Sequence, residues 1–289
     1  MPNNNEGNLR RAAATIAAAD ALLIGAGAGM GVDSGLPDFR GSEGFWRAYP
    51  PYAKLGLSFA EIANPEHFAT DPAFGWGFYG HRGNLYRRTR PHEGFAILRR
   101  WAGGMAHGPA VFTSNVDDHF HKAGFDADRI AEVHGSIERR QCLAGCGVGI
   151  FPAGEGEVAI DPETFRAVGD LPACPACGGL ARPNILMFGD WGYDSSRGDD
   201  QMERLRGWLE GLGDARLAVI EFGAGRGIPT VRRFSEQVAG ALGATLIRVN
   251  PREPDVPAGH VSLPMGALEA IRAIDDRLPG SGGQGLGGG

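Results

Sequence analysis

Short apolar runs and longer amphipathic segments alternate along most of this chain. The apolar runs lie at residues 21–24, 110–112, 130–133, 215–222 and 244–249. Runs without polar alternation are typical of strands that are buried on both faces of a sheet. The segments that place apolar residues at helical spacing lie at 8–19, 92–101, 200–212, 230–241 and 266–278. This alternation predicts an α/β fold in which helices cover both faces of a parallel sheet.

Two kinds of segment fall outside this alternation. Residues 41–91 are rich in aromatic side chains, and we expect an irregular stretch of short helices that forms a lid, with a plain aromatic core as the alternative. Residues 1–7 are polar and residues 280–289 read GSGGQGLGGG, so we expect both ends to be disordered. Asn8 is the expected N-cap of the first helix.

The first apolar run opens directly into a series of glycines. They stand at positions 25, 27, 29 and 31. Glycines after a buried strand let the backbone turn tightly and bring its N–H groups close to a phosphate. The spacing does not give a strict G-x-G-x-x-G, because Val32 and Ser34 occupy the positions where the third glycine would fall. A plain flexible loop therefore stays open as the alternative.

Length, charge and hydropathy narrow the class of protein. The chain has 289 residues, a net charge of −6 and a pI near 5.8, which argues against an obligate nucleic-acid binder. Arg10 and Arg11 precede an alanine-rich run that could be mistaken for a secretory leader, but Asp20 interrupts it. No run approaches the roughly 18 apolar residues that span a bilayer. We expect a cytoplasmic protein without a membrane partner.

All four cysteines lie between residues 142 and 177. Cys142 and Cys146 form one close pair, and Cys174 and Cys177 form the other. Two short-range pairs of this kind are typical of a tetrahedral zinc site with four thiolates, which leaves no open position and is therefore structural. Two disulfides are the alternative.

Polar side chains follow the second and third apolar runs. Thr113 to Asp117 reads TSNVD, and its Asn115 and Asp117 stand where an open α/β sheet places ligand groups, although an Asx turn would also account for them. His134 follows the third run. Imidazole titrates near neutral pH, so a histidine at the end of a strand is a candidate general base.

Taken together, these stretches resemble the sirtuins, the Sir2-like NAD-dependent deacylases. Residues 27–40, GAGMGVDSGLPDFR, resemble the sirtuin motif GAG-x-S-x-x-S-G-I-P-D-F-R and depart from it at Gly31. TSNVD resembles T-Q-N-I-D with Ser114 in place of glutamine, and His134-Gly135 resembles the H-G motif of the catalytic base. The cysteine pairs resemble the sirtuin zinc ribbon.

Three further segments carry the resemblance with departures. Residues 182–190 resemble R-P-x-V-V-x-F-G-E, with Asp190 in place of the glutamate. Gly223 matches the start of the G-T-S-L loop, but Ala224 and Gly225 remove two hydroxyl groups. Asn250 follows the last run as in the I-N motif. These departures lie in recognition loops.

The resemblance implies NAD and zinc as cofactors and an acylated protein or peptide as partner. It implies His134 as the catalytic base, with Asn115 and Asp117 beside it, and the four cysteines as zinc ligands. The implied NAD-binding residues are Gly27, Ala28, Gly29, Asp38, Phe39, Arg40, Ser114, Asn115, Asp117, Gly223 and Asn250.

The implied organisation is a Rossmann-like NAD-binding domain at 1–138 and 182–279, a helical lid at 41–91, a small zinc-binding module at 139–181 and a flexible tail at 280–289. The implied activity is NAD-dependent protein-lysine deacylation, which releases nicotinamide and O-acyl-ADP-ribose. A protein ADP-ribosyltransferase or NAD hydrolase on the same scaffold is one alternative. A non-catalytic sensor that binds NAD or ADP-ribose is another.

Overall fold

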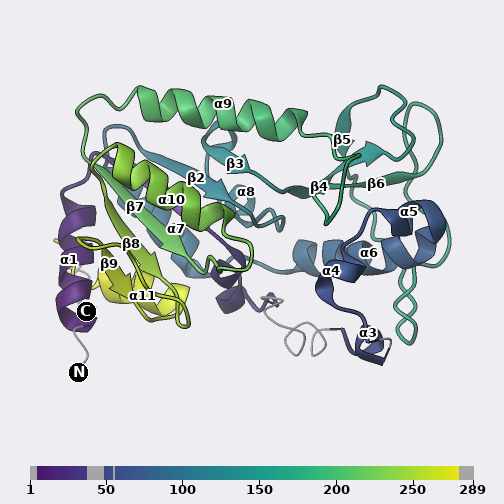
Figure 1. Ribbon diagram of the computed structural model, residues 1–289, viewed down its shortest axis with the longest axis horizontal. Coiled ribbons are helices and arrows are strands. Elements are labelled where there is room, and N and C mark those ends of the chain that lie inside the picture. The colour runs from purple at the N-terminus through teal and green to yellow at the C-terminus, as the bar shows by residue number, and fades with distance from the viewer. Residues whose placement is uncertain (1–4, 38–48, 55, 280–289) are drawn as a thin grey trace, which may run out of the picture.

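The computed structural model describes residues 5–37, 49–54 and 56–279. Its described part has two sheets at opposite ends of an elongated molecule, as Figure 1 shows. One is a six-stranded parallel sheet in the order β3-β2-β1-β7-β8-β9. The other is a three-stranded antiparallel sheet in the order β5-β4-β6.

The six parallel strands confirm the predicted α/β class. Their bounds are β1 Ala21–Ala26, β2 Pro109–Thr113, β3 Ile130–Glu132, β7 Leu217–Phe222, β8 Thr245–Val249 and β9 Val261–Leu263. All of the apolar runs predicted as strands are strands here. The edge strand β9 was not predicted.

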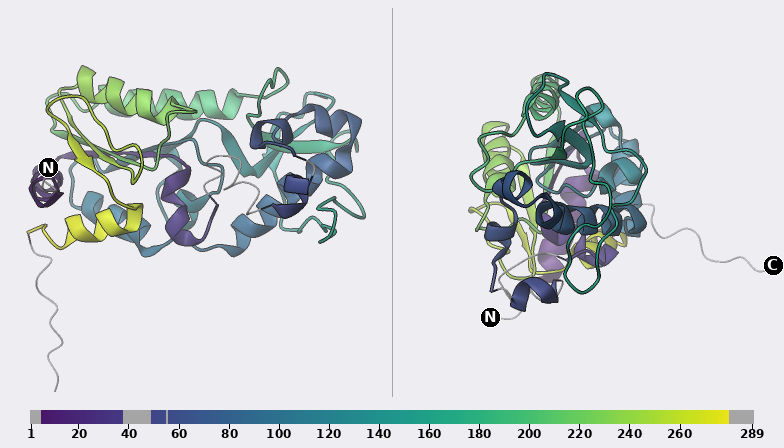
Figure 2. Two further views of the ribbon diagram at one scale, coloured as in Figure 1. Left: turned by 60° about the horizontal axis from the view of Figure 1, so that its bottom comes forward. Right: turned by 90° about the vertical axis from the view of Figure 1, so that its right-hand side faces the viewer.

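Helices cover both faces of this sheet, and the left view of Figure 2 shows the two helix layers on opposite sides of it. One layer contains α1 Asn5–Ala17, α7 Glu93–Gly103 and α11 Ala267–Asp275. The other contains α9 Ser196–Glu210 and α10 Thr230–Ala241. Alternate strand residues point into the two layers. Leu22 and Ile24 belong to one hydrophobic cluster, and Ala21 and Leu23 belong to the other.

The register aligns the carboxyl ends of the strands at one edge of the sheet. Ala26, the last residue of β1, pairs with Thr113 of β2 on one side and with Phe222 of β7 on the other. In the same way Thr113 pairs with Glu132, and Phe222 pairs with Val249. The chain moves from β1 in both directions across the sheet, so this edge is the switch point where α/β sheets bind ligands.

The second sheet carries the cysteines. Its strands are β4 Gly135–Cys142, β5 Ile150–Pro152 and β6 Ala181–Ile185. β4 begins directly after His134, which itself follows β3, so the two sheets are joined at the candidate site. Helices α3 Pro50–Lys54, α4 Phe59–Ile62, α5 Glu66–Thr70 and α6 Pro72–Arg88 pack at this end (Figure 1).

Two expectations about local structure are wrong. Helix α1 spans Asn5–Ala17, so Asn8 lies within it and is not its N-cap. The Asn8 side chain donates from Nδ2 to the Ser262 carbonyl at 2.9 Å. Residues 5–7 are therefore helical, whereas residues 1–4 and 280–289 lie outside the described residues.

The second wrong expectation concerns residues 72–88. They form one helix of 17 residues, α6, and not an irregular stretch. The Asp71 side chain accepts from the Phe74 N–H at 3.3 Å and caps the helix, and Pro72 begins it. Because α6 contains several glycines, the sequence pattern did not predict this helix. They are explained by close packing, because a Cβ at Gly77 would lie 2.0 Å from the carbonyl oxygen of Phe165.

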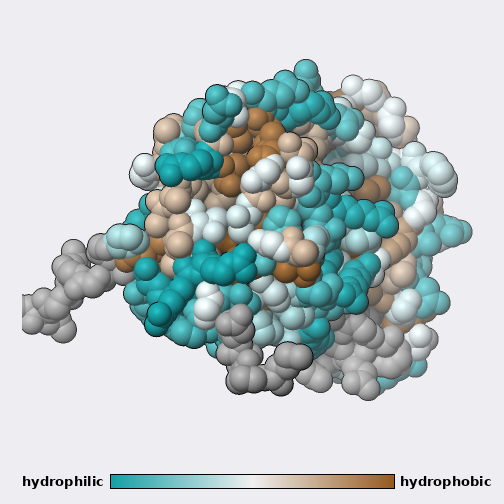
Figure 3. All heavy atoms as spheres, turned by 60° about the vertical axis from the view of Figure 1, so that its left-hand side comes forward, coloured by the Kyte–Doolittle hydropathy of each residue, from teal (hydrophilic) through white to brown (hydrophobic). Residues whose placement is uncertain are grey.

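The surface at the large-sheet end is mostly polar. On the face drawn in Figure 3, hydrophilic side chains cover most of the surface and hydrophobic residues form smaller patches between them. In the described ranges, no helix combines the length and the apolar character that a membrane crossing requires.

Candidate active site

A cavity of about 690 Å³ lies at the carboxyl edge of the parallel sheet. It is lined by the loops that follow β1, β2, β3 and β7, by helix α6 and by the segment that follows β6. The predicted site residues that line it are Gly27, Ala28, Ser114, Asn115, Asp117, His134 and Gly223. Gly29 and Asn250 lie behind these loops, and Asp38, Phe39 and Arg40 lie outside the described residues.

The glycine loops after β1 and β7 pack directly against each other. The N–H of Gly29 donates to the Gly223 carbonyl at 3.2 Å. Gly223 has a φ of 58°, and a Cβ there would lie 2.3 Å from the Cα of Gly29. A Cβ at Gly27 would lie 2.7 Å from the Cα of Ala224. Backbone therefore meets backbone here, and only glycine fits.

Asn250 holds the second of these loops from behind. It is fully buried, and its Nδ2 donates to the Ala224 carbonyl at 2.9 Å. Its Oδ1 accepts from the backbone N–H groups of Arg252 and Glu253 at 3.1 and 3.0 Å. The side chain thus ties the loop after β7 to the loop after β8.

Asn115 is fixed beside the first glycine loop. Its Nδ2 donates to the Gly27 carbonyl at 2.9 Å, and its N–H donates to the Thr113 hydroxyl at 3.0 Å. That hydroxyl donates to the Ala26 carbonyl at 3.1 Å. The chain of bonds connects the ends of β1 and β2.

Asp117 lies deeper in the cavity and is 8% exposed. Its Oδ1 accepts from the His119 N–H at 3.0 Å, which is the Asx turn that the sequence left open. This turn fixes the carboxyl group without removing it from the cavity wall. Burial raises the pKa of Asp117 to about 6, and the Glu132 carboxylate acts in the same direction.

His134 lies between β3 and β4 and lines the same cavity. Its carbonyl accepts from the Leu186 N–H at 3.0 Å, which joins the residue to the segment after β6. Burial lowers the pKa of the His134 imidazole below its ordinary value. The ring is therefore neutral at pH 7, which is the form that can accept a proton.

Helix α6 contributes a wall that the sequence analysis missed. Tyr79, Arg82 and Tyr86 lie on one face and line the cavity. Arg82 is 6% exposed and donates from Nε and Nη2 to the Tyr86 hydroxyl at 3.0 and 2.7 Å. Burial raises the pKa of Tyr79 to about 12, so its hydroxyl stays protonated at neutral pH. The i, i+3, i+7 spacing was the available signal.

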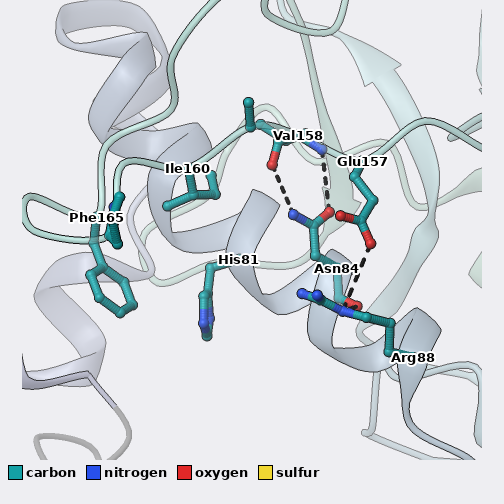
Figure 4. A pocket seen from close by; sticks show the side chains of 9 residues that line it. His81, Asn84, Arg88, Glu157, Val158, Ile160 and Phe165 are labelled. Carbon is teal, nitrogen blue, oxygen red and sulfur yellow. Dashed lines mark hydrogen bonds and ion pairs between the residues drawn. The ribbon is translucent and has the colours of Figure 1, made fainter.

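The opposite face of α6 lines a separate cavity of about 500 Å³, drawn in Figure 4. Asn84 and the backbone of Val158 bond each other twice there, at 2.8 and 3.2 Å. Arg88 lies 3.7 Å from Glu157 at its edge. None of the predicted site residues that the structure describes lines this cavity.

Leu186, Met187 and Phe188 close another side of the main cavity. The side chains of Leu186 and Phe188 are 42% and 41% exposed, unusually high for large apolar residues. Asp190, which replaces a glutamate in the resembling motif, does not face the cavity. Its carboxylate is buried and pairs with Arg182.

The four cysteines form one cluster away from the cavity. The Sγ atoms of Cys142 and Cys177 are 3.7 Å apart, and those of Cys146 and Cys174 are 3.6 Å apart. A disulfide requires about 2.05 Å, so the thiols are free. Four sulfurs at about 2.3 Å from a tetrahedral zinc ion would lie about 3.8 Å from one another. The cluster therefore fits zinc.

The electrostatics of the cluster also suit a metal. Backbone N–H groups, first of all that of Cys146, lower the pKa of the Cys142 thiol to about 6. A thiolate is the form that binds zinc. A second acidic and imidazole cluster, Asp118, His121 and Glu132, already contains the guanidinium of Arg197 as counter-charge.

Known proteins resemble this chain in sequence and in fold. The model of the Sir2 family matches residues 27–202. An NAD-dependent protein deacylase of Thermus thermophilus is 31% identical over 252 residues, which are 86% of each chain. The mitochondrial NAD-dependent protein deacylase sirtuin-5 of Danio rerio is 34% identical over 184 residues, 58% of this chain.

The first three curated relatives are matched over only 57% to 61% of their own length. Among solved structures, a Sir2 homologue in complex with ADP ribose superposes with a TM-score of 0.67 at 27% identity, over 92% of this chain and 96% of that one. The fold and the family predicted from the motifs are thereby confirmed, and the chain belongs to the Sir2 family.

Proposed function

We propose that this protein is an NAD-dependent protein-lysine deacylase that releases nicotinamide and O-acyl-ADP-ribose. The observation that carries the proposal is the single cavity in which the glycine loops, Asn115, Asp117 and His134 meet. The names of the relatives, which are NAD-dependent protein deacylases, support the same reaction. The ADP ribose in the similar Sir2 structure supports a nucleotide site.

The interlocked glycine loops would bind the pyrophosphate of NAD. Gly27, Ala28 and Gly223 carry little or no side chain, so a phosphate can approach their backbone closely. The N–H groups of Gly27 and Gly223 already donate to the carbonyls of Phe222 and Val249, at 2.9 Å each. Asn115, held by the Gly27 carbonyl, would orient the nicotinamide amide and ribose. NAD supplies the ADP-ribosyl group that finally accepts the acyl chain.

Asp117 and His134 would have different roles in the reaction. An ionised Asp117 would favour the positive charge that develops on the ribose as nicotinamide leaves. The neutral His134 imidazole would take a proton from a ribose hydroxyl and so activate it. The apolar side chains of Ile185 and Met187 exclude water from this part of the cavity.

The acylated protein would bind along the segment after β6. Leu186 and Phe188 expose apolar surface at the cavity wall, and an extended peptide can bury part of that surface by lying along it. The acyl-lysine side chain would then enter the cavity from that side.

The four cysteines would hold a structural zinc ion. None of them lines the cavity, and four thiolates leave no position for substrate. Zinc would fix the turns at the ends of β4 and β6.

We retain two organisational expectations as part of this proposal. The chain would divide into an NAD-binding domain at 1–138 and 182–279, with a helical lid at 41–91, and a zinc-binding module at 139–181. Four free thiols in one cluster support a reducing compartment such as the cytoplasm. The net charge of −6 supports a partner other than nucleic acid.

The reaction is tested by identifying its products. The full chain is incubated with NAD alone and with NAD plus lysine peptides whose acyl groups differ in length and charge, and the products are resolved by mass spectrometry. We expect nicotinamide, deacylated peptide and O-acyl-ADP-ribose in equal amounts, and only when an acylated peptide is present.

The other outcomes separate the alternatives. ADP-ribosylated protein, or free ADP-ribose without peptide, would contradict deacylation and assign a transferase or a hydrolase. NAD that binds without any release of nicotinamide would assign a sensor.

A further inference from the structure

Trp191 is the most exposed large hydrophobic residue in the described ranges, with its whole side chain accessible. It lines a groove of about 450 Å³, here called the Trp191 groove, together with Pro65, Glu66, Phe188, Asp190 and Gly192. A fully exposed indole makes no stabilising apolar contact with the rest of the folded chain. Because the burial of its apolar surface would be favourable, the residue suits an external partner.

The Trp191 groove adjoins the active-site cavity at Phe188. Phe188 lines both of them. Its N–H donates to the Ala63 carbonyl at 3.0 Å, and Ala63 lines the cavity while the next two residues, Asn64 and Pro65, line the groove. A polypeptide that lies along Phe188 therefore reaches both.

The backbone that presents Trp191 is rigidly held on both sides. The buried Asp190 carboxylate accepts from Arg182 Nη1 at 2.9 Å and from the Met187 N–H at 3.3 Å. The Gly192 carbonyl accepts from Gln141 Nε2 at 2.6 Å. The backbone at Trp191 is thus held on both sides, and the residue is not at the tip of a loose loop.

The charges of the groove favour a cation. Arg182 and Asp190 are both buried and neutralise each other. Glu66 remains as an exposed carboxylate, and none of the ion pairs in the described ranges includes it. The face of an indole attracts a guanidinium or an ammonium group, and a nearby carboxylate adds to that attraction.

We propose that the Trp191 groove binds an arginine or lysine side chain of the substrate polypeptide, close in sequence to the acyl-lysine. This inference rests on the proposed function, because it takes the acyl-lysine to enter the cavity past Phe188. An extended chain advances about 3.3 to 3.6 Å per residue, so a neighbour within a few positions of the acyl-lysine reaches the groove.

The test measures peptide affinity without NAD, so that it does not depend on turnover. Fluorescent alanine-based peptides carry a central acetyl-lysine and a single arginine at each position from three before it to three after it. A parallel set carries norleucine in place of arginine. Anisotropy titrations use the full chain and the variants Trp191→Ala, Trp191→Phe and Glu66→Gln. The matched control is Leu242→Ala, since Leu242 is an exposed apolar residue at the end of α10.

We expect arginine at one or two positions to lower the Kd by about 3- to 10-fold relative to alanine. Trp191→Ala should abolish this preference, Trp191→Phe and Glu66→Gln should retain part of it, and Leu242→Ala should retain all of it. Because the indole makes no buried contact, Trp191→Ala should unfold at an unchanged temperature.

Three results would overturn the inference: an arginine preference that survives in Trp191→Ala, norleucine that improves affinity as much as arginine, or peptides that do not bind at all. The product assay keeps the two proposals apart. If acylated peptides drive nicotinamide release but show no dependence on Trp191, the groove assignment fails and the deacylase stands. If the preference depends on Trp191 but no nicotinamide is released, the deacylase fails.

Discussion

His134 and Asp117 line the same cavity, and burial changes their ionisation in opposite directions. Burial disfavours the charged form of each group, so it lowers the pKa of His134 and raises that of Asp117 to about 6. Near pH 7 the cavity therefore holds a neutral imidazole beside a carboxylate that is still ionised. Neither state depends on an ion pair of these two residues with each other.

His134→Ala should lower kcat by about 10²- to 10⁴-fold, because it would remove the proposed general base. The affinity for NAD should change little, since the glycine loops and Asn115 are untouched. Steady-state nicotinamide release and calorimetry with NAD measure the two quantities. His107→Ala is the control: His107 precedes β2, at the opposite edge of the sheet, and its replacement should leave kcat unchanged. Equal rates for His134→Ala and the unaltered chain would remove His134 from the mechanism.

Asp117→Asn should stabilise the fold at pH 7 while it lowers kcat/KM. The folded pKa of about 6 lies above the value of about 3.9 in an unfolded chain, so stability is greatest below pH 4 and falls as the pH rises through 6. Asparagine removes this penalty, and we expect a gain of about 1 to 3 kcal/mol in the free energy of unfolding at pH 7, which vanishes at pH 4.

Urea unfolding at both pH values measures the effect of Asp117→Asn. The surface variant Asp128→Asn serves as the control and should stay within about 0.5 kcal/mol of the unaltered chain. A loss of stability at pH 7 in Asp117→Asn would show that its carboxylate is stabilised where it lies.

The loops after β1 and β7 function as one element, because Gly29 and Gly223 are in backbone contact. Gly223→Ala should separate these loops and weaken NAD binding by at least about 10-fold. It should also lower the free energy of unfolding by more than the roughly 1 to 2 kcal/mol that a positive φ costs a residue with a Cβ. Gly243→Ala is matched to it: Gly243 has a φ of 60°, has open space around its Cα and precedes β8 at the other edge. Calorimetry with NAD and urea unfolding compare the two. Equal losses in both variants would show that φ alone, and not the contact, governs Gly223.

Elements that bury two faces or one clear helical stripe could be predicted from their own residues. β1, β7 and β8 are continuous apolar runs because helices cover both of their faces. β9 was missed, since it has only three residues at the sheet edge and its central Ser262 is partly exposed. α6 was missed because its glycines are explained only by the segment that contains Phe165, far along the chain.

The residues of the candidate site also divide into those that could be predicted from the local sequence and those that could not. Gly27, Asn115, His134 and Gly223 could be predicted because each follows a strand, and strand ends of a parallel sheet share an edge. The wall formed by Tyr79, Arg82 and Tyr86 could not. Their i, i+3, i+7 spacing indicates a shared helix face, but what that face lines depends on how α6 packs against the strand ends.

At the scale of the whole molecule, both ends contribute walls to the cavity. The parallel sheet supplies the glycine loops and Asp117, whereas the other end supplies α6 and the segment after β6. The connection is short, because only Val133 and His134 separate β3 from β4 and Leu186 follows β6 directly. The small sheet must therefore be folded for the cavity walls at His134 and at Leu186 to be in place.

Removal of zinc should consequently abolish the proposed deacylation, although no cysteine lines the cavity. Cys142 ends β4, and the second cysteine pair precedes β6, so the metal would hold together the two strands that lead to His134 and to Leu186. In such sites the free energy of metal binding is free energy of folding. We expect one zinc ion per chain by elemental analysis. A chelator should lower the unfolding temperature and stop peptide-dependent nicotinamide release, while far-UV circular dichroism keeps most of the helical signal of the parallel-sheet end. Added Zn²⁺ should restore activity and Mg²⁺ should not, because magnesium prefers oxygen ligands. A metal-free chain that keeps both its unfolding temperature and its turnover would show that the four thiols are dispensable for the cavity walls.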